Sequence, residues 1–172
     1  QPGTPSTGSG TKGLLASVPH LDPTRVDDVI VGNAVPEAEQ GLQVGRIIAA
    51  KAVGFSAPGI TINRYCASGL ESIAMATAKI RTGMAECIIA GGAESMSLVP
   101  TAGWKTVPSY AIAKDEPDYY LSMGLTAEEV AKDFNISRED QDEFSYHSHM
   151  KAANAIKEGY FKSGILPITV EQ

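Results

Sequence analysis

The chain has few of the residues that build disulfide frameworks, metal centres or nucleic-acid surfaces. Its 172 residues include two cysteines and three histidines. Two cysteines are too few for a disulfide framework and lack metal-ligand spacing, so we expect a reducing, cytoplasmic compartment and no metal. The net charge is −6, and no basic cluster occurs. This excludes nucleic-acid binding as the main function, because such proteins concentrate Lys and Arg on one face.

Long hydrophobic runs are also absent. The apolar stretches are interrupted by charge or glycine well short of the roughly 20 residues that span a bilayer, so we expect no membrane span. A hydrophobic content of 43% with 20% charged residues is typical of a globular protein, and the length suffices for a core. The first eleven residues are mostly Pro, Gly, Ser and Thr. This composition predicts a disordered or non-native tail over residues 1–13.

Strand and helix patterns alternate through the amino-terminal half. Runs of apolar residues ended by glycine or polar residues predict strands, and 3.6-residue spacing predicts helices. Their alternation predicts an α/β fold, with a mostly parallel sheet covered by helices on both faces. The second helix is expected to pack through one aliphatic face, made of Leu70, Ile73, Ala74, Thr77 and Ala78. The predicted strands are 26–32, 59–63 and 86–90, and the predicted helices are 42–53 and 66–82.

The carboxyl-terminal half begins with a long irregular stretch. Periodicity lapses over 95–124, but the aromatic residues there favour an ordered excursion. The sequence from Thr126 to Glu129 has capping-box form and predicts a helix that ends near Phe134. Ser137 with Asp140 predicts a longer helix that ends at Gly159. Residues 165–170 predict a last strand, with Pro167 at its edge or start.

Cys66 lies where the second predicted strand gives way to a helix. The first N–H groups of a helix have no intrahelical partners and carry partial positive charge, so they favour the reactive thiolate. Most free cysteines are small core residues, but this position, with Gly69 allowing close backbone approach, favours a nucleophile. Cys87 lies between apolar residues and is expected to pack.

None of the histidines is an obvious base for Cys66. His20 lies in a loop bounded by prolines. His147 and His149 are two residues apart on a predicted helix, so they point to different sides, which also disfavours a metal site. Either the base lies on sequence outside this chain, or the thiol is not catalytic here.

Two further groups of residues permit alternative interpretations. Gly91 and Gly92 resemble a phosphate cradle, but they lack the P-loop and GxGxxG spacings. Close packing against the Cys66 turn is therefore favoured. Met123 and the tyrosines of the excursion either line a pocket for a flexible acyl or pantetheine chain or pack the excursion onto the core.

Four motifs in order resemble the amino-terminal half of the thiolase family, specifically a 3-ketoacyl-CoA or acetoacetyl-CoA thiolase. They are NRYCASGL (63–70), AGGAESMS (90–97), MGLTAE (123–128) and ISREDQD (136–142). The resemblance extends from about Leu14 to the carboxyl end. It implies a layered thiolase fold whose first strand is missing here. It divides the chain into an α/β core (14–97), a loop-domain excursion with helices (98–164) and a returning strand (165–172).

The resemblance implies an acyltransferase in which Cys66 carries an acyl group as a thioester. Coenzyme A is then a co-substrate, with no other cofactor. The reaction is cleavage of a 3-ketoacyl-CoA by CoA or the reverse Claisen condensation of acyl-CoA. Ser122 and Met123 are implied to bind substrate, and Gly69, Gly91 and Gly92 to shape the site. A homodimer or homotetramer is implied for the complete protein.

The sequence also departs from the family. A thiolase has a second half that carries an activating His, an acid/base Cys and an Asn that orients an oxyanion-hole water, and these motifs are not among the 172 residues. We therefore expect this chain alone to be inactive. The alternatives are a non-catalytic fragment or partner of a split assembly, and a cysteine hydrolase, which needs a paired His. Ser122 stands where the biosynthetic branch has His, which favours the degradative direction.

Overall fold

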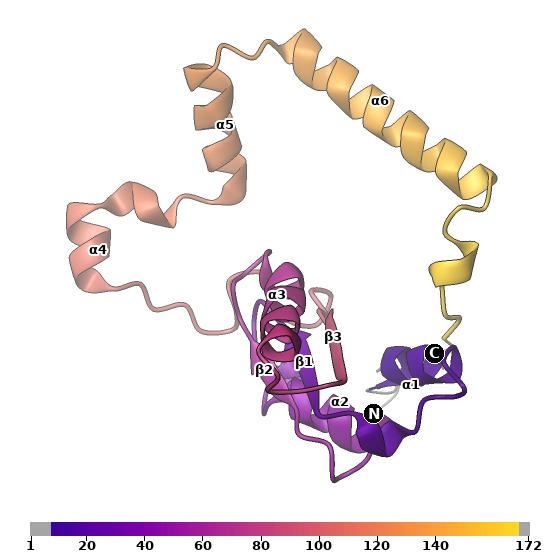
Figure 1. Cartoon of the computed structure of the whole chain (residues 1–172). Coiled ribbons are helices and arrows are strands. Elements are labelled where there is room, and N and C mark those ends of the chain that lie inside the picture. Colours follow the sequence, from indigo (N-terminus) through magenta and orange to yellow (C-terminus); the bar gives the residue numbers. More distant parts are fainter. Residues whose placement is uncertain (1–7, 169–172) are drawn as a thin grey trace. The chain divides into compact units, whose positions relative to one another are not determined.

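The computed structural model describes residues 8–168, which form two compact units. Within the described part, the first unit comprises residues 8–106 and 166–168, and the second comprises 107–165. The first unit contains a three-stranded sheet with helices on both faces (Figure 1). Its elements are α1 (Ser9–Ala16), η1 (Pro23–Arg25), β1 (Asp28–Gly32), η2 (Ala38–Gln40), α2 (Val44–Ala52), β2 (Ile60–Ile62), α3 (Ser68–Arg81) and β3 (Ile88–Gly92).

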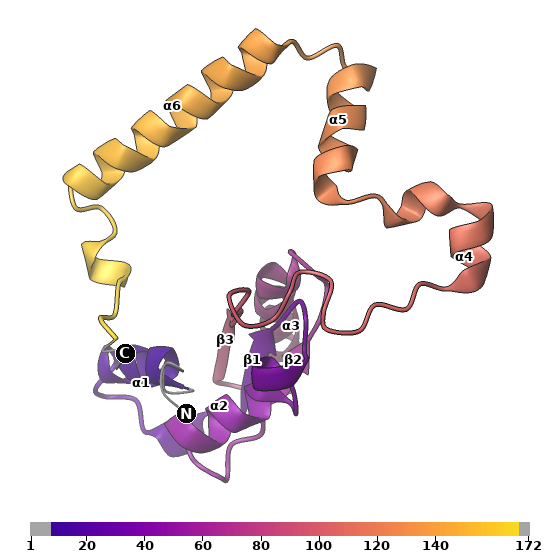
Figure 2. The same ribbon diagram turned by 180° about the vertical axis from the view of Figure 1, so that it is seen from behind.

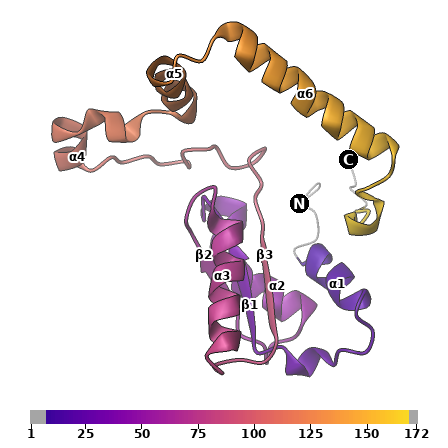
Figure 3. The same ribbon diagram turned by 45° about the horizontal axis from the view of Figure 1, so that its top comes forward.

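The sheet is parallel, in the order β2-β1-β3. All five residues of the central strand β1 are buried. Because side chains alternate along a strand, Val29 and Val31 pack with α2 residues on one face. Asp28 and Gly32 meet α3 on the other face, and α3 lies over the strands (Figure 3). The predicted α/β fold, a parallel sheet covered by helices, is confirmed.

The predicted packing face of α3 is wrong. Leu70 and Ile73 are 71% and 54% exposed, whereas the buried residues of α3 are Ser68, Ser72 and Ala76. The reason is the short distance between the start of α3 and the end of β1 at Gly32, which admits only small side chains there. Ser72 is fully buried and its hydroxyl contacts the carbonyl oxygens of Gly69 and Gly91.

Several predicted boundaries shift in the structure. Residues 9–13 belong to helix α1, so the predicted tail is wrong over that range, while residues 1–7 lie outside the described residues. α3 begins at Ser68 and not at Cys66. β3 extends through Gly92, so the glycine pair lies within the strand and not after it, opposite Val31 and Gly32.

The second unit consists of short and long helices, seen from behind in Figure 2. Within the predicted 95–124 excursion the chain forms α4 (Tyr110–Asp115) and η3 (Pro117–Tyr120), and the rings of Tyr119 and Tyr120 meet edge to face. None of the described residues of this unit is buried. The elements are α4 (Tyr110–Asp115), η3 (Pro117–Tyr120), α5 (Met123–Asp133), α6 (Arg138–Lys157) and η4 (Lys162–Gly164).

Caps define the helices of this unit. α5 begins one turn earlier than predicted, because the hydroxyl of Ser122, and not of Thr126, accepts the N–H of Leu125. The capping box of α6 is confirmed, with Ser137 and Asp140 bonded reciprocally. The hydrogen bonds from Ser137 lower the pKa of the Asp140 carboxyl. The predicted last strand is wrong for residues 165–168, and the rest of it lies outside the described residues.

Carboxylates anchor the amino ends of β1 and β3. Asp28 is buried and forms an ion pair with Lys79 of α3. Asp27 accepts the backbone N–H groups of Glu86 and Cys87 at 2.7 and 3.0 Å. These bonds, that of Cys87 first, lower the pKa of Asp27 below 3.8.

Replacing this carboxylate by Asp27→Asn should lower the melting temperature by an amount that depends on pH. A folded-state pKa below the ordinary value means that the stabilisation is present above pH 3.8 and disappears as the pH falls below it. The difference in melting temperature between the wild-type and variant chains should therefore be largest near neutral pH and narrow below about pH 4. Thermal denaturation across this range measures it. Asp133→Asn is the charge-matched control, and a pH-independent difference would contradict the prediction.

The buried face of α3 can be tested with two substitutions of adjacent residues. Ser72→Ala removes the hydroxyl contacts with Gly69 and Gly91 and should lower the free energy of unfolding by about 1–2 kcal/mol. Ile73→Ala removes more apolar volume but from an exposed position, so its effect should stay within about 0.5 kcal/mol. Denaturant titration of both variants measures the two values, and a larger loss for Ile73→Ala would restore the aliphatic face predicted from sequence.

Candidate active site

Cys66 lies in the turn between β2 and α3. It is a free, exposed cysteine two residues ahead of the first residue of α3. The N-cap residue is Ala67, and no side chain caps this end of the helix. Cys66 therefore lies next to the positive end of the α3 dipole.

Side chains on both sides of Cys66 hold the turn in shape. Tyr65 has a φ of 48°, in the left-handed region. Its N–H donates to Oδ1 of Asn63 at 2.8 Å, and its carbonyl oxygen accepts from the hydroxyl of Ser68. Arg64 donates two hydrogen bonds to the Glu71 carboxylate, at 2.8 and 3.1 Å. This pairing raises the pKa of the Arg64 guanidinium.

Gly32, which sequence reasoning missed, makes the close approach that had been predicted at Gly69. A Cβ atom on Gly32 would lie 2.4 Å from the carbonyl carbon and oxygen of Ser68. A Cβ on Gly69 or Gly91 would meet no atom within 4 Å, and one on Gly92 would lie 3.8 Å from the Cα of Gly69. The predictions for Gly69 and Gly91 are therefore wrong in this respect. The signal for Gly32 was its place at the end of a buried strand.

A cluster around Glu94 joins the loops that follow β1 and β3. The carboxylate accepts the N–H of Ala34 at 2.7 Å and the side-chain amides of Gln40 and Asn33 at 2.6 and 3.2 Å. Gln40 in turn accepts the N–H of Ser95. Asn33 and Gln40 are buried. Sequence reasoning missed this cluster, although Asn33 and Glu94 each follow a predicted strand, and the carboxyl ends of parallel strands meet at one edge.

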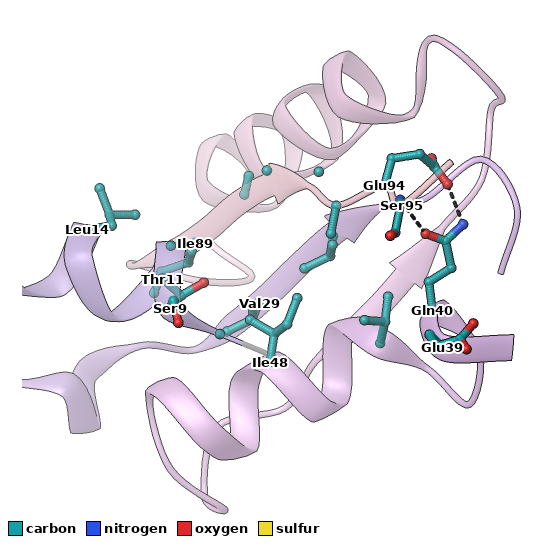
Figure 4. Close-up of a pocket in the computed structure, with 18 of the residues that line it drawn as sticks. Ser9, Thr11, Leu14, Val29, Glu39, Gln40, Ile48, Ile89, Glu94 and Ser95 are labelled. Atoms are coloured by element: carbon teal, nitrogen blue, oxygen red, sulfur yellow. Dashed lines mark hydrogen bonds between the residues drawn. The ribbon is translucent and has the colours of Figure 1, made fainter. Parts of the chain in front are cut away.

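A pocket of about 450 Å³ lies on the sheet face that carries Val29 and Val31 (Figure 4). Its walls are apolar residues of α1, α2 and β3, such as Leu14, Ile48 and Ile89. Its polar lining includes Glu39, Gln40, Glu94 and Ser95, with the last three joined by hydrogen bonds. Cys66 does not line this pocket.

The other predicted site residues lie in the second unit. Ser122 caps α5, and Met123 is the first residue of that helix and 71% exposed. The ring of His149 contacts a carbonyl oxygen within its own helix, and His147 lies 3.6 Å from Glu143. Within the described residues, no hydrogen bond or ion pair joins a histidine to Cys66.

No helix in residues 8–168 has the length and hydropathy needed to cross a membrane. The same part of the chain holds no group of three or more His, Cys, Asp or Glu side chains arranged for a metal ion.

The first unit is an α/β domain, a parallel sheet covered by helices, with an exposed cysteine at a strand-to-helix turn. Comparison with known proteins identifies its family. The model of the thiolase N-terminal domain matches residues 9–172, so the chain belongs to the thiolase family. The resemblance of its motifs to that family is thereby confirmed.

Individual relatives agree with this assignment. The chain is 55% identical over 146 residues to a 3-ketoacyl-CoA thiolase of Bacillus subtilis, a match that covers 84% of this chain and 37% of the relative. It is 41% identical over 152 residues to the peroxisomal 3-ketoacyl-CoA thiolase B of Candida tropicalis, covering 87% and 37%. The solved acetyl-CoA acetyltransferase of Bacillus anthracis matches with a TM-score of 0.79 and 30% identity, covering 98% of this chain and 46% of that one.

These relatives support membership of a family of thiolase-type acyltransferases. They match this chain over only part of their own length. The chain spans less than half the length of each of them. One relative is named as peroxisomal, so the predicted cytoplasmic location stays a prediction.

The close contact between Gly32 and α3 can be tested by comparing the effects of an alanine at Gly32 and an alanine at Gly69 on stability. Gly32→Ala places a Cβ against the Ser68 backbone, which must shift, so we expect a loss of stability of about 1–3 kcal/mol. Gly69→Ala meets no atom within 4 Å in a helical position and should be neutral or stabilise by up to about 1 kcal/mol. Denaturant titration measures both values. Equal losses in the two variants would show that Gly69, too, is sterically constrained.

Proposed function

We propose that this chain supplies the acyl-carrying cysteine of a 3-ketoacyl-CoA thiolase, and that this residue is Cys66. The observation that carries the proposal is the position of Cys66, exposed at the uncapped amino end of α3, in a chain of the thiolase family. Cys87, the other cysteine, lies partly buried against the core cluster, which favours a packing role for it.

The proposed chemistry has two steps. In the first, the Cys66 thiolate attacks the 3-keto carbon of a 3-ketoacyl-CoA, and the bond between C2 and C3 breaks. The acyl group stays on sulfur as a thioester, and the departing carbanion takes a proton to become acetyl-CoA. In the second, the thiol of coenzyme A loses its proton and attacks the thioester, which releases a shortened acyl-CoA and returns the thiolate. The reverse sequence is the Claisen condensation.

In this scheme the residues of this chain stabilise and position the sulfur of Cys66. The positive end of the α3 dipole favours the Cys66 thiolate before the first attack and as the leaving group of the second. Arg64, paired with Glu71, fixes the turn without being free to neutralise the sulfur. Proton transfer needs an acid and a base, and the resemblance to thiolases assigns these roles to residues of a second half, outside these 172 residues.

Two observations support the degradative direction. The curated relatives from Bacillus subtilis and Candida tropicalis are named 3-ketoacyl-CoA thiolases. Ser122 stands immediately before Met123 and caps α5, at the position where the resemblance gives biosynthetic members a His. Substrate binding by Ser122 and Met123 belongs to the same proposal.

Substituting the nucleophile tests the proposed chemistry. In the complete enzyme, Cys66→Ser should abolish the acyl adduct that forms with an acyl-CoA, because a serine hydroxyl is not deprotonated at this position and is a far weaker nucleophile. Mass spectrometry of the intact protein and of its peptides detects the adduct and its site. Cys87→Ser is the matched control and should retain the adduct at Cys66. An adduct that survives Cys66→Ser would refute the assignment.

A further inference from the structure

We propose that Glu94 and Asn63 are positioning residues for Cys66, coupled through the backbone of Ala34. The inference rests on the proposed function in one respect, that acylation of Cys66 is the reaction whose rate the two residues affect. Neither residue needs to touch the substrate.

The coupling consists of three hydrogen bonds in series. Glu94 accepts the N–H of Ala34 at 2.7 Å. The carbonyl oxygen of Ala34 accepts the side-chain amide of Asn63 at 3.0 Å. Oδ1 of Asn63 accepts the N–H of Tyr65 at 2.8 Å, and Cys66 is the next residue. One residue, Ala34, is therefore held from both sides by the two side chains.

The last bond of the series acts on a strained residue. Tyr65 has a φ of 48° although it carries a large side chain, and such a conformation persists only where its surroundings enforce it. The Asn63 side chain enforces it by accepting the Tyr65 N–H, as asparagine does in tight turns. Relaxation of Tyr65 would rotate the following peptide and carry Cys66 away from the start of α3.

The first bond of the series, from the N–H of Ala34 to Glu94, depends on the negative charge of the Glu94 carboxylate. The Glu94 carboxylate also accepts the side-chain amides of Gln40 and Asn33, which are 5% and 0% exposed. All three partners of the carboxylate are donors. A glutamine at position 94 would therefore place its own side-chain N–H₂ group, also a donor, against one of them. The bonds to an ionised acceptor are also stronger than neutral ones.

The strands do not depend on these three bonds. β1 and β3 remain paired from Asp28–Ile88 to Gly32–Gly92, the N–H of Asn33 donates to Ile62, and that of Ala93 donates to Gly32. Loss of the series would therefore leave the sheet intact and remove only the hold of Asn63 on the Tyr65 N–H, while the Ser68 hydroxyl still donates to the Tyr65 carbonyl oxygen. This separates a positioning role from a purely structural one.

A double-mutant cycle in the complete enzyme tests the proposal. Asn63→Ala and Glu94→Gln should each slow formation of the Cys66 acyl adduct by about 10- to 100-fold, the order expected for a misplaced reacting group. KM for the acyl-CoA should change less than about twofold, because binding contacts are retained. The double variant should be no slower than the slower single variant, because both act through Ala34. Asp28→Asn, which breaks the buried ion pair with Lys79, is the control that loses stability without slowing acylation.

Three results would overturn the proposal: single variants that acylate at the wild-type rate, losses that multiply in the double variant, or an Asp28→Asn control that slows acylation as much. If Glu94→Gln does not fold, Asn63→Ala in the exposed turn decides alone, and a wild-type rate in it refutes the proposal.

A second readout separates this proposal from the proposed function. The rate of alkylation of Cys66 by iodoacetamide, referred to Cys87 in the same digest, requires no thiolase chemistry. Asn63→Ala and Glu94→Gln should each slow it by about fivefold, because the sulfur is no longer held at the amino end of α3. If the wild-type enzyme forms no acyl adduct, the proposed function fails and the positioning role still stands or falls on this rate.

Discussion

The close contact between the end of β1 and the start of α3 is the constraint on which the first unit depends. At Gly32 the backbone of the strand lies so near that of Ser68 that a single methyl group would not fit. The contact sets the height of α3 above the sheet. It therefore sets which side chains α3 can bury and where the Cys66 turn sits relative to the strand ends.

The residues that α3 buries follow from this distance. A helix held so close to the sheet has no room for branched aliphatic side chains underneath, so Ser72 and Ala76 are buried and Leu70 and Ile73 are not. The buried hydroxyl of Ser72 is satisfied by backbone carbonyl oxygens, as a buried polar group must be. The aliphatic residues form an outer face that this unit leaves exposed.

Sequence reasoning predicted the order of strands and helices, the parallel sheet and the position of Cys66 at its edge, because these follow from local patterns. It gave the wrong face of α3, since amphipathicity assigns the larger aliphatic residues to the core and here the distance to Gly32 does not admit them. It also missed Glu94 and Asn33, whose contact joins residues far apart in the chain. The cap of α5 was misplaced because both Ser122 and Thr126 can cap a helix, and only the three-dimensional path shows which does.

The register of the sheet has a consequence for the order in which the chain folds. β1 and β3 pair residues about 60 positions apart, beginning with Asp28 and Ile88. The central strand can therefore complete its ladder only after the ribosome has released the segment through Gly92, and closing so long a loop is slow. α6 is stabilised by local hydrogen bonds and carries its own capping box, so it can form within microseconds of its synthesis. The sheet beside Cys66 can therefore form only after a distant segment has been synthesised, whereas the helices that follow it form from local sequence.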